Sequence, residues 1–275
     1  MTALSLNLDT PELAAHYERA SVDRQFKAGK LLIERIGVQA GQRVLDVGSG
    51  TGLLAEHVAG IVGPSGQVDA VDPLPLRIEI AKRKAKPNLR FSVGDAYALD
   101  ELPDATFDAV YLNAVFHWFP EKLAPLRSFH RLLKAGGKLG ISTGSKTSTN
   151  RIHDIQREVL ARAPFNAHIQ PEQGLPQRVS PEELSELGRR AGFAVHSLTV
   201  EPHSQLHADA EAAIDHSQAS SFGNLLGHLP ENLRERARRE VVVELNKLRG
   251  PEGIRTEGAR IFAVFVKART QRHVY

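Results

Sequence analysis

The chain has 275 residues, enough to bury a sizeable core as one large domain or as one domain with an inserted cap. Hydrophobic residues make up 41% and charged residues 24% of the sequence, and the net charge of +3 is not gathered into a basic cluster. This pattern argues against a nucleic-acid partner. The chain contains no cysteine, no signal-like N-terminus and no apolar run approaching about 20 residues. We therefore expect a cytoplasmic protein without disulfides and without a membrane partner.

Two helices are predicted before the first strand. Thr10-Pro11-Glu12 has the pattern of a helix start, with threonine as the N-cap, proline at the first helical position and an acidic residue after it. Apolar residues then recur at helical spacing as far as Ile36. Gly37 and Gly41 mark the turn into the first strand.

The next hundred residues alternate between strand and helix patterns. Strands are predicted at 43–47, 67–71, 89–93, 107–112 and 138–142, and helices at 51–60, 75–86 and 121–134. Strands that alternate with helices through short connections form right-handed βαβ units. We therefore expect an α/β fold built on a parallel sheet.

The pattern loosens after the fifth strand. A helix is predicted at about 147–163, and Ser180 with Glu183 has the spacing of a capping box for another. Further strands are predicted at 193–200 and 261–266, with helical sequence over 206–249 between them. The sequence thus predicts seven strands, with helical insertions after the fifth strand and between the last two, which would form a lid.

The first strand runs into a glycine-rich turn, Val44-Leu45-Asp46-Val47-Gly48-Ser49-Gly50-Thr51-Gly52. A turn of this kind presents backbone N–H groups to a ligand, and side chains at Gly48 or Gly50 would hold the ligand away. Asp46 would repel a pyrophosphate but suits a ligand that carries positive charge. The third glycine also comes one residue too early for the dinucleotide motif, because Leu53 stands where that motif needs a small residue.

Acidic or amide residues also follow the other strands. They are Asp72 before Pro73, Asp95 within Gly94-Asp95-Ala96, and Asn113. Ligands of parallel sheets bind beyond the carboxyl ends of the strands. In this place Asp72 can accept hydrogen bonds from ribose hydroxyls and Asp95 from an adenine amino group. Each acidic residue alone is also a common turn or cap residue, whereas the set at successive strand ends indicates a nucleoside-like ligand.

The combination resembles the class I S-adenosylmethionine-dependent methyltransferase family. The resemblance rests on the glycine turn with Asp46, on Asp72, on Gly94-Asp95-Ala96, on Phe107-Asp108-Ala109-Val110 leading to Asn113, and on Leu132-Leu133-Lys134-Ala135-Gly136-Gly137. It implies a Rossmann-like, seven-stranded, mostly parallel sheet whose last strand is antiparallel and inserted between the fifth and sixth. It also implies S-adenosyl-L-methionine as cofactor and S-adenosyl-L-homocysteine as product.

The resemblance implies a role for each matching residue. Asp46, Gly48, Ser49, Gly50 and Gly52 would lie along the methionine moiety. Asp72 with Pro73 would bind the ribose, and Gly94, Asp95 and Ala96 the adenine. Tyr17 would close over the donor, and Asn113 would complete the cofactor site. For Tyr17, packing in the core is an equal alternative.

Two stretches are more closely similar to small-molecule O-methyltransferases, such as those that act on trans-aconitate or on malonyl thioesters. They are Tyr17–Gln25 and Leu112–Phe119. The implied organisation is one structural domain, with N-terminal helices covering the cofactor site (1–40), a cofactor-binding core (41–145) and a remainder with substrate caps (146–275, caps at about 146–180 and 203–252). The implied activity is methylation of a small molecule, at the oxygen of a carboxylate or hydroxyl.

The acceptor side is predicted after the fourth strand. His117 is the candidate general base, and Trp118 a candidate wall of the acceptor pocket. Arg24, Arg151 and His153 are candidate anchors for an anionic acceptor. The alternatives are a histidine packed at the rim beside Trp118 and ordinary surface residues. The histidines of the cap lack the paired spacing of a zinc site, so we expect no metal.

Several alternatives stay open at this point. The acceptor atom can be nitrogen, sulfur or carbon, and the isoelectric point of about 9.2 is the one feature that favours an RNA or protein substrate. A nicotinamide-dependent oxidoreductase and a non-catalytic adenosine-ligand sensor are the alternatives from other classes. The chain is expected to act as a monomer or a homodimer.

Overall fold

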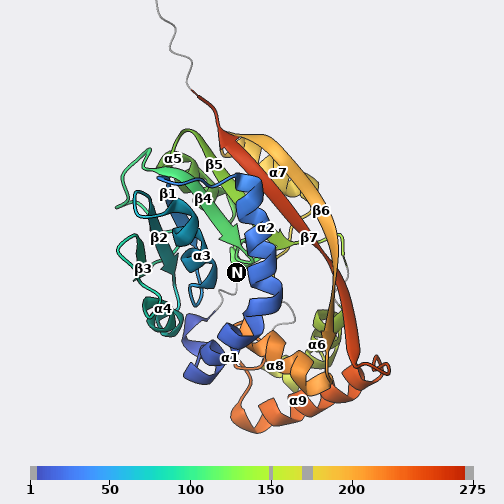
Figure 1. Cartoon of the computed structure of the whole chain (residues 1–275). Coiled ribbons are helices and arrows are strands. Elements are labelled where there is room, and N and C mark those ends of the chain that lie inside the picture. Colours follow the sequence, from blue (N-terminus) through green and yellow to red (C-terminus); the bar gives the residue numbers. More distant parts are fainter. Residues whose placement is uncertain (1–4, 149–150, 169–175, 270–275) are drawn as a thin grey trace, which may run out of the picture. The chain divides into compact units, whose positions relative to one another are not determined.

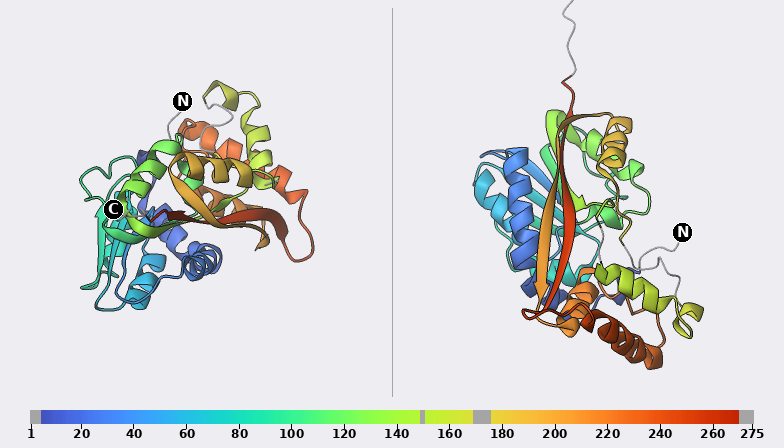
Figure 2. Two further views of the ribbon diagram at one scale, coloured as in Figure 1. Left: turned by 90° about the horizontal axis from the view of Figure 1, so that it is seen from above. Right: turned by 90° about the vertical axis from the view of Figure 1, so that its right-hand side faces the viewer.

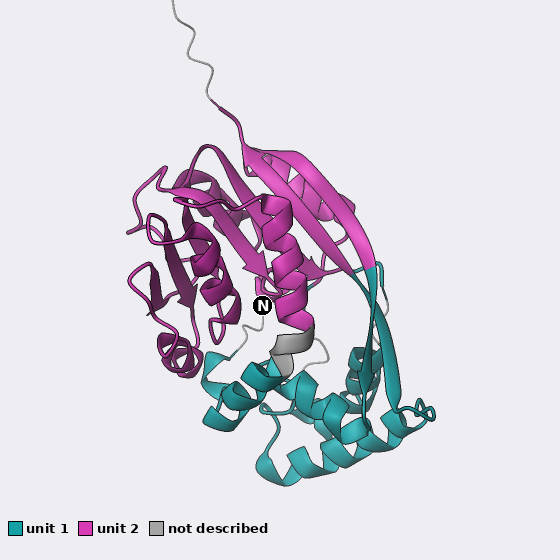
Figure 3. Cartoon of the chain, viewed as in Figure 1, with its two compact units in different colours: residues 1–20, 146–177, 202–259 teal, residues 21–145, 178–201, 260–275 magenta. Residues whose placement is uncertain are grey.

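The computed structural model describes residues 5–148, 151–168 and 176–269. Its contacts divide the chain into two compact units, where the sequence predicted one structural domain with inserted caps. Unit 1 consists of residues 1–20, 146–177 and 202–259, and unit 2 of residues 21–145, 178–201 and 260–275 (Figure 3). After residue 145, unit 1 spans residues 146–177 and 202–259, and the predicted caps span about 146–180 and 203–252. Their predicted arrangement as a lid stays a prediction.

A seven-stranded sheet runs in the order β3-β2-β1-β4-β5-β7-β6 (Figure 1). The strands are β1 (Arg43–Val47), β2 (Gln67–Asp72), β3 (Leu89–Val93), β4 (Phe107–Asn113), β5 (Leu133–Gly144), β6 (Phe193–His207) and β7 (Ile254–Lys267). β1 pairs in parallel with β2 and β4, β2 with β3, and β4 with β5. β7 pairs with β5 in antiparallel orientation. This confirms the predicted fold class, including the insertion of the last strand beside the fifth.

Helices of unit 2 cover both faces of the sheet (Figure 2). They are α2 (Lys27–Ile36), α3 (Leu53–Val62), α4 (Pro75–Lys82), α5 (Leu123–Leu132) and α7 (Pro181–Arg190). One core cluster joins α2, α3 and α4 to one face, and a second joins α5 and α7 to the other. The central strands β1 and β4 are buried and mostly apolar on both faces because both faces are covered.

Local helix signals in the sequence are confirmed where they depend on neighbouring residues. The Thr10 hydroxyl accepts a hydrogen bond from the Leu13 N–H at 3.2 Å, ahead of α1 (Pro11–Ser21). Ser180 and Glu183 form the predicted capping box at the start of α7. Such caps satisfy backbone N–H groups that have no partner within the helix.

Unit 1 has its own core, which joins α6 (Arg151–Leu160), α8 (Ala210–Ser220) and α9 (Glu231–Asn246). The predicted helical region 206–249 is wrong at two points. Residues 206–207 extend β6, and residues 221–230 form turns between α8 and α9. Gly223 has a φ of +81° and Pro230 cannot donate a helical hydrogen bond, so neither residue suits a continuous helix.

β6 and β7 are longer than predicted, with 15 and 14 residues. In β7 the predicted run 261–266 is the part that lies in the core, and the added residues 254–259 include alternating polar ones. In β6 only the two end residues, Phe193 and His207, are buried. No helix among the described residues is long and apolar enough to cross a membrane.

Candidate functional site

The glycine turn between β1 and α3 is held against the neighbouring strand. Gly48 and Ser49 donate backbone hydrogen bonds to the Val71 carbonyl at 2.8 and 3.0 Å. Gly48 has a φ of +78°, and a Cβ atom there would lie 2.3 Å from Cγ2 of Val115. The sequence attributed this glycine to the approach of a ligand. The structure adds that the protein's own packing requires it.

Asp72, at the end of β2, organises two segments at once. Its Oδ2 accepts a hydrogen bond from the Gly50 N–H at 2.8 Å, and its Oδ1 accepts one from the Leu74 N–H at 2.9 Å. The carboxylate is 6% exposed. Pro73 lies between these anchored positions. Asp72 therefore couples the glycine turn to the start of α4, and its predicted contact with a ribose would use a carboxylate that is already oriented.

Asp46 and Tyr111 form a buried pair on adjacent strands. The Tyr111 hydroxyl donates to Oδ2 of Asp46 at 2.7 Å, and both side chains are almost fully buried. Burial raises the pKa of Asp46 to about 7, against the lowering effect of the Tyr111 hydrogen bond, and the charge of Asp72 raises it further. Burial also raises the pKa of Tyr111 well above its usual value. A positively charged ligand near Asp46 would favour the ionised carboxylate.

Sequence reasoning missed Tyr111. Its position in the β1–β4 register is directly opposite Asp46. A phenol within an otherwise apolar strand was the available signal, because a buried tyrosine hydroxyl needs a polar partner.

Two buried oxygen atoms at this edge of the sheet have no hydrogen-bond partner among the residues that the structure describes. They are Oγ of Ser49 and Oδ1 of Asn113. The Asn113 amide orientation is determined by its Nδ2, which donates to the Gln25 carbonyl at 2.8 Å. Buried polar atoms in folded proteins are nearly always hydrogen-bonded. The two oxygens therefore fit a ligand with hydrogen-bond donors, such as the ammonium and hydroxyl groups of the predicted cofactor.

The predicted adenine-binding segment follows β3. Gly94 donates a backbone hydrogen bond to the Asp72 carbonyl at 3.1 Å, and Ala96 is buried. Asp95 is exposed, and its Oδ1 accepts from the Tyr97 N–H at 3.0 Å, which is the bond of a turn residue. Its contact with adenine stays a prediction.

His117 and Trp118 lie in a short helix, η3 (Phe116–Trp118), after β4. Nδ1 of His117 lies 3.0 Å from Oγ1 of Thr143, which is fully buried on β5. The rings of His117 and Trp118 are 5.0 Å apart. The histidine is thus oriented by a hydroxyl that sequence reasoning missed. The contact with Trp118 is also what a histidine packed at the rim would make. The role of His117 as a base therefore stays a prediction.

The remaining predicted residues are divided between the units. Arg24 lies in η2 (Val22–Phe26) of unit 2, whereas Tyr17 lies in α1 and Arg151 and His153 in α6 of unit 1. Their roles toward cofactor and acceptor stay predictions. Among the described residues, no group of three or more histidine, aspartate or glutamate side chains is placed to hold a metal ion.

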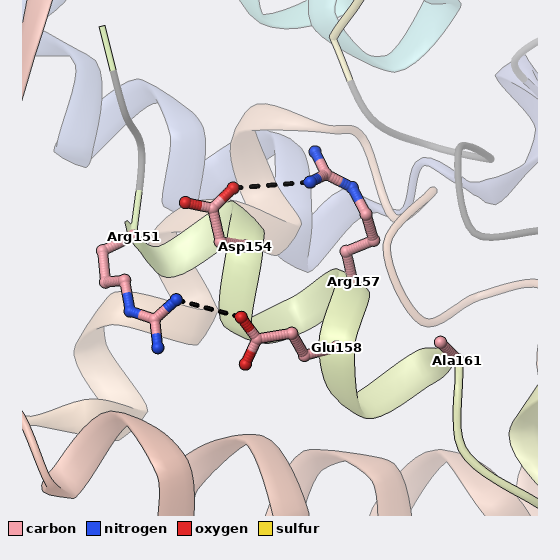
Figure 4. Close-up of a pocket in the computed structure, with 5 residues that line it drawn as sticks. All are labelled: Arg151, Asp154, Arg157, Glu158 and Ala161. Carbon is pink, nitrogen blue, oxygen red and sulfur yellow. Dashed lines mark hydrogen bonds and ion pairs between the residues drawn. The ribbon is translucent and has the colours of Figure 1, made fainter.

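A pocket of about 450 Å³ lies on the polar side of α6. It is lined by Arg151, Asp154, Arg157, Glu158 and Ala161 (Figure 4). Arg151 pairs with Glu158 at 3.0 Å and Arg157 with Asp154 at 3.4 Å. The charges of this pocket therefore compensate each other within a single helix.

Comparison with known proteins supports the identity of the core. Residues 44–137 match the family model described as a methyltransferase domain. Malonyl-[acyl-carrier protein] O-methyltransferase 1 of Ilyobacter polytropus is 31% identical over 137 residues, which cover 49% of this chain and 50% of that protein. A ubiquinone/menaquinone biosynthesis C-methyltransferase of Pseudomonas putida is 37% identical over 128 residues, covering 45% and 49%. The chain spans about half the length of these curated relatives.

Solved structures show the same fold. Phosphoethanolamine N-methyltransferase 2 of Haemonchus contortus, solved in complex with S-adenosyl-L-methionine, has a TM-score of 0.59 and 18% identity, covering 94% of this chain and 58% of that one. A SAM-dependent methyltransferase of Aquifex aeolicus has a TM-score of 0.52 and 22% identity, covering 69% and 92%. With the glycine turn and the strand order, these matches identify residues 44–137 as a methyltransferase domain, set in a Rossmann-like fold.

Proposed function

We propose that this protein transfers the methyl group of S-adenosyl-L-methionine to an oxygen of a small-molecule acceptor, a carboxylate or a hydroxyl. The observation that carries the proposal is the carboxyl edge of β1, β2 and β4. It combines a buried carboxyl group of raised pKa, an oriented Asp72 and the unpartnered oxygens of Ser49 and Asn113.

The chain's own residues would bind and orient the cofactor. Asp46, Ser49 and Asn113 offer oxygen acceptors to its positively charged amino-acid end. Asp72 offers carboxylate oxygens to its ribose, and Asp95 and Ala96 would flank its adenine. When bound, S-adenosylmethionine supplies a methyl group on a sulfonium, which is a good leaving group. The protein's main task is then alignment, and proximity alone can contribute about 7–11 kcal/mol to lowering the barrier.

The acceptor determines whether a base is needed. A carboxylate is already a nucleophile near neutral pH, whereas a hydroxyl must lose its proton during transfer. For a hydroxyl, His117 is the proposed base. The contact of its Nδ1 with Oγ1 of Thr143 at 3.0 Å would orient the ring. Trp118 would form a wall of the acceptor pocket, and Arg24, Arg151 and His153 would attract an anionic acceptor.

The relatives leave other acceptor atoms as alternatives. One is a malonyl-[acyl-carrier protein] O-methyltransferase by name, whereas others are ubiquinone/menaquinone biosynthesis C-methyltransferases. We propose oxygen because the stretch Leu112–Phe119 resembles small-molecule O-methyltransferases. Transfer to nitrogen, sulfur or carbon would be recognised from the atom to which the methyl group is bound in the product.

Calorimetry with S-adenosylhomocysteine tests cofactor binding directly. We expect micromolar affinity in the wild type and a loss of about 1.5–3 kcal/mol, or at least tenfold, in Asp72→Ala. Asp69→Asn is the matched control, since Asp69 lies on the same strand and pairs with Arg43 at the surface. No binding to the wild type, or equal binding by Asp72→Ala, would contradict the proposal. Quenching of fluorescence by NADH instead would indicate an oxidoreductase.

Turnover with methyl-labelled S-adenosylmethionine then tests the acceptor. Carboxylic acids, phenols, amines and thiols are compared as acceptors. Label released from the product by mild base indicates a methyl ester, and label that resists it indicates an ether, amine, thioether or carbon bond. Transfer only to nitrogen, sulfur or carbon would replace the oxygen proposal. Transfer only to RNA or protein, with binding that weakens steeply as salt rises, would replace the small-molecule proposal.

A further inference from the structure

Tyr97 connects the predicted adenine-binding segment to the loop that follows β4. Its backbone N–H donates to Oδ1 of Asp95 at 3.0 Å. The Tyr97 hydroxyl donates to the backbone carbonyl of Glu121 and accepts a hydrogen bond from the Glu121 N–H at 3.3 Å. We call residues 116–121 the acceptor-side segment. Two hydrogen bonds therefore join this segment to a residue 24 positions earlier in the chain.

Aromatic rings extend this connection toward the predicted acceptor site. The Tyr97 ring contacts the Phe119 ring edge to face, with centroids 5.6 Å apart, and Phe119 contacts Phe116 in the same way at 5.8 Å. Phe116 is the first residue of η3, the short helix that contains His117 and Trp118. The tyrosine is therefore joined to the acceptor-side segment by its ring as well as by its hydroxyl.

Glu121 anchors the end of the acceptor-side segment to a helix. Its carboxylate accepts hydrogen bonds from the Leu123 and Ala124 N–H groups, both at 2.7 Å, at the start of α5. A carboxylate in this place satisfies N–H groups that have no partner within the helix, and the helix dipole favours its charge. α5 thus fixes one end of the segment, and the contacts of Tyr97 hold the part between η3 and α5.

Tyr97 is more exposed than the rings it joins. It is 39% exposed, whereas Phe119 is 6% and Phe116 0% exposed. A loop residue held by a few contacts at such a position is released more readily than a residue of a buried strand. Adenine bound to Asp95 would stabilise the turn that positions Tyr97, because Oδ1 of the same carboxylate accepts the Tyr97 N–H. Occupation of the adenine subsite would therefore favour the conformation in which Tyr97 contacts Phe119 and Glu121.

We propose that Tyr97 is a positioning residue, through which occupation of the adenine subsite orders the acceptor-side segment with His117 and Trp118. The proposal rests on the proposed methyltransferase function and adds how its two subsites communicate. Tyr97 acts through Glu121 and Phe119 and not through contact with the acceptor. Coupling between two binding sites is reciprocal, so an ordered acceptor-side segment raises the affinity for the cofactor by the same factor.

The chain has a single tryptophan, Trp118, whose fluorescence reports directly on the acceptor-side segment. S-adenosylhomocysteine is titrated into the protein, and calorimetry gives the fraction bound at each point. We expect the emission of Trp118 in the wild type to change in proportion to that fraction. Tyr97→Phe keeps the ring and loses both hydroxyl bonds, so at saturation it should lose about half of the change or more. Tyr97→Leu loses the ring contact as well and should show almost none of it.

Cofactor affinity and folding separate positioning from a purely structural role. Tyr97→Phe should bind S-adenosylhomocysteine within about tenfold of the wild type, and its thermal unfolding should stay close to that of the wild type. The matched control is Thr106→Val, which removes a hydroxyl bond to the Pro103 carbonyl at 2.8 Å in the same connection between β3 and β4. This bond stays within the loop, so the control should give the full change in Trp118 emission.

A change in Trp118 emission of wild-type size in saturated Tyr97→Leu would overturn the proposal, because the change would then come from direct contact with the cofactor. If Tyr97→Leu is poorly folded, Tyr97→Phe decides by the same criterion. Loss of cofactor binding in Tyr97→Phe would assign the tyrosine to the cofactor site itself and overturn the proposal as well.

Two results for the wild type distinguish this inference from the function on which it rests. Binding of S-adenosylhomocysteine without a change in Trp118 emission would refute the role of Tyr97 alone. Absence of binding in calorimetry would refute the proposed function, and the role of Tyr97 with it.

Discussion

The carboxyl edge of the sheet and the pocket on α6 differ in how far their polar side chains are buried and paired. At the sheet edge, Asp46 and Tyr111 are buried and bonded to each other, while oxygens of Ser49 and Asn113 are buried without partners. On α6, Arg151 and Glu158 are about half exposed and pair within the helix. Both regions carry charge, but at the sheet edge the buried oxygens without partners lie on the same edge as a buried carboxyl group of raised pKa.

This difference indicates where binding energy is available. Exposed ion pairs contribute about 0–1 kcal/mol because water and salt screen them, and a ligand gains little by replacing them. A buried acceptor without a donor costs about 1–3 kcal/mol, which a ligand that donates to it would recover. A hollow on the surface is therefore weaker evidence for a site than unsatisfied groups in the interior.

The largest expected effect comes from filling the glycine turn. Gly48→Ala places a Cβ atom against Val115 at a left-handed φ, so we expect a destabilisation of about 1–3 kcal/mol and loss of measurable cofactor binding. Urea unfolding and calorimetry measure the two effects. Gly60→Ala in α3 is the control, because its Cβ would meet nothing within 4 Å and should stabilise the helix by about 0.5–1 kcal/mol. Equal behaviour of both variants would refute this account of the turn.

The ionisation of Asp46 should appear in the pH dependence of stability. Its pKa is about 7 in the folded protein and about 3.9 in an unfolded chain. Between these values the folded state binds more protons, so the contribution of Asp46 is complete below pH 4 and is lost as pH rises through 7. The loss is on the order of a few kcal/mol.

Asp46→Asn removes this titration. We expect the unfolding free energy of the wild type, relative to the variant, to fall between pH 5 and pH 8 in urea titrations. Affinity of the wild type for S-adenosylmethionine should rise over the same range, because a cation favours the carboxylate. A constant difference in stability between wild type and variant would show that Asp46 titrates normally.

The hydrogen bond of Tyr111 gives a smaller effect. Tyr111→Phe leaves the Asp46 carboxyl without its donor in a buried place, so we expect a loss of about 1–3 kcal/mol in chemical unfolding. Tyr97→Phe is the comparison, because the Tyr97 hydroxyl bonds to the Glu121 carbonyl at an exposed position. Its loss should be about 0.5 kcal/mol or less. If Tyr111→Phe and Tyr97→Phe lowered the unfolding free energy equally, burial would not explain the contribution of the Asp46–Tyr111 hydrogen bond to stability.

The smallest effects belong to α6. Both amide atoms of Gln156 are buried without a partner among the described residues. Gln156→Leu should therefore stabilise the protein by about 1 kcal/mol. Arg151→Ala, on the exposed side of the same helix, should change stability by less than about 0.5 kcal/mol. Thermal unfolding of both variants checks the pair of values, and destabilisation by Gln156→Leu would show that the amide has a role in the fold.

Local signals in the sequence were sufficient for much of the fold. Thr10 and Ser180 start helices as predicted because a cap depends only on residues three positions away. The strand pattern was readable because buried strands are apolar throughout. The break at 221–230 was missed, since the apolar stripe of α9 was extended back across Gly223 and Pro230.

By itself, the sequence determined the glycine turn, the acidic residues at the strand ends, and through them the resemblance of the core to a methyltransferase domain. These features lie within single strand-to-turn segments, where spacing along the chain fixes geometry. Only the tertiary structure decided that Tyr111 would meet Asp46 and that Arg260 would meet Ser142, partners that lie 65 and 118 residues apart. Such pairs depend on strand order and register, and these are set by the packing of the whole sheet.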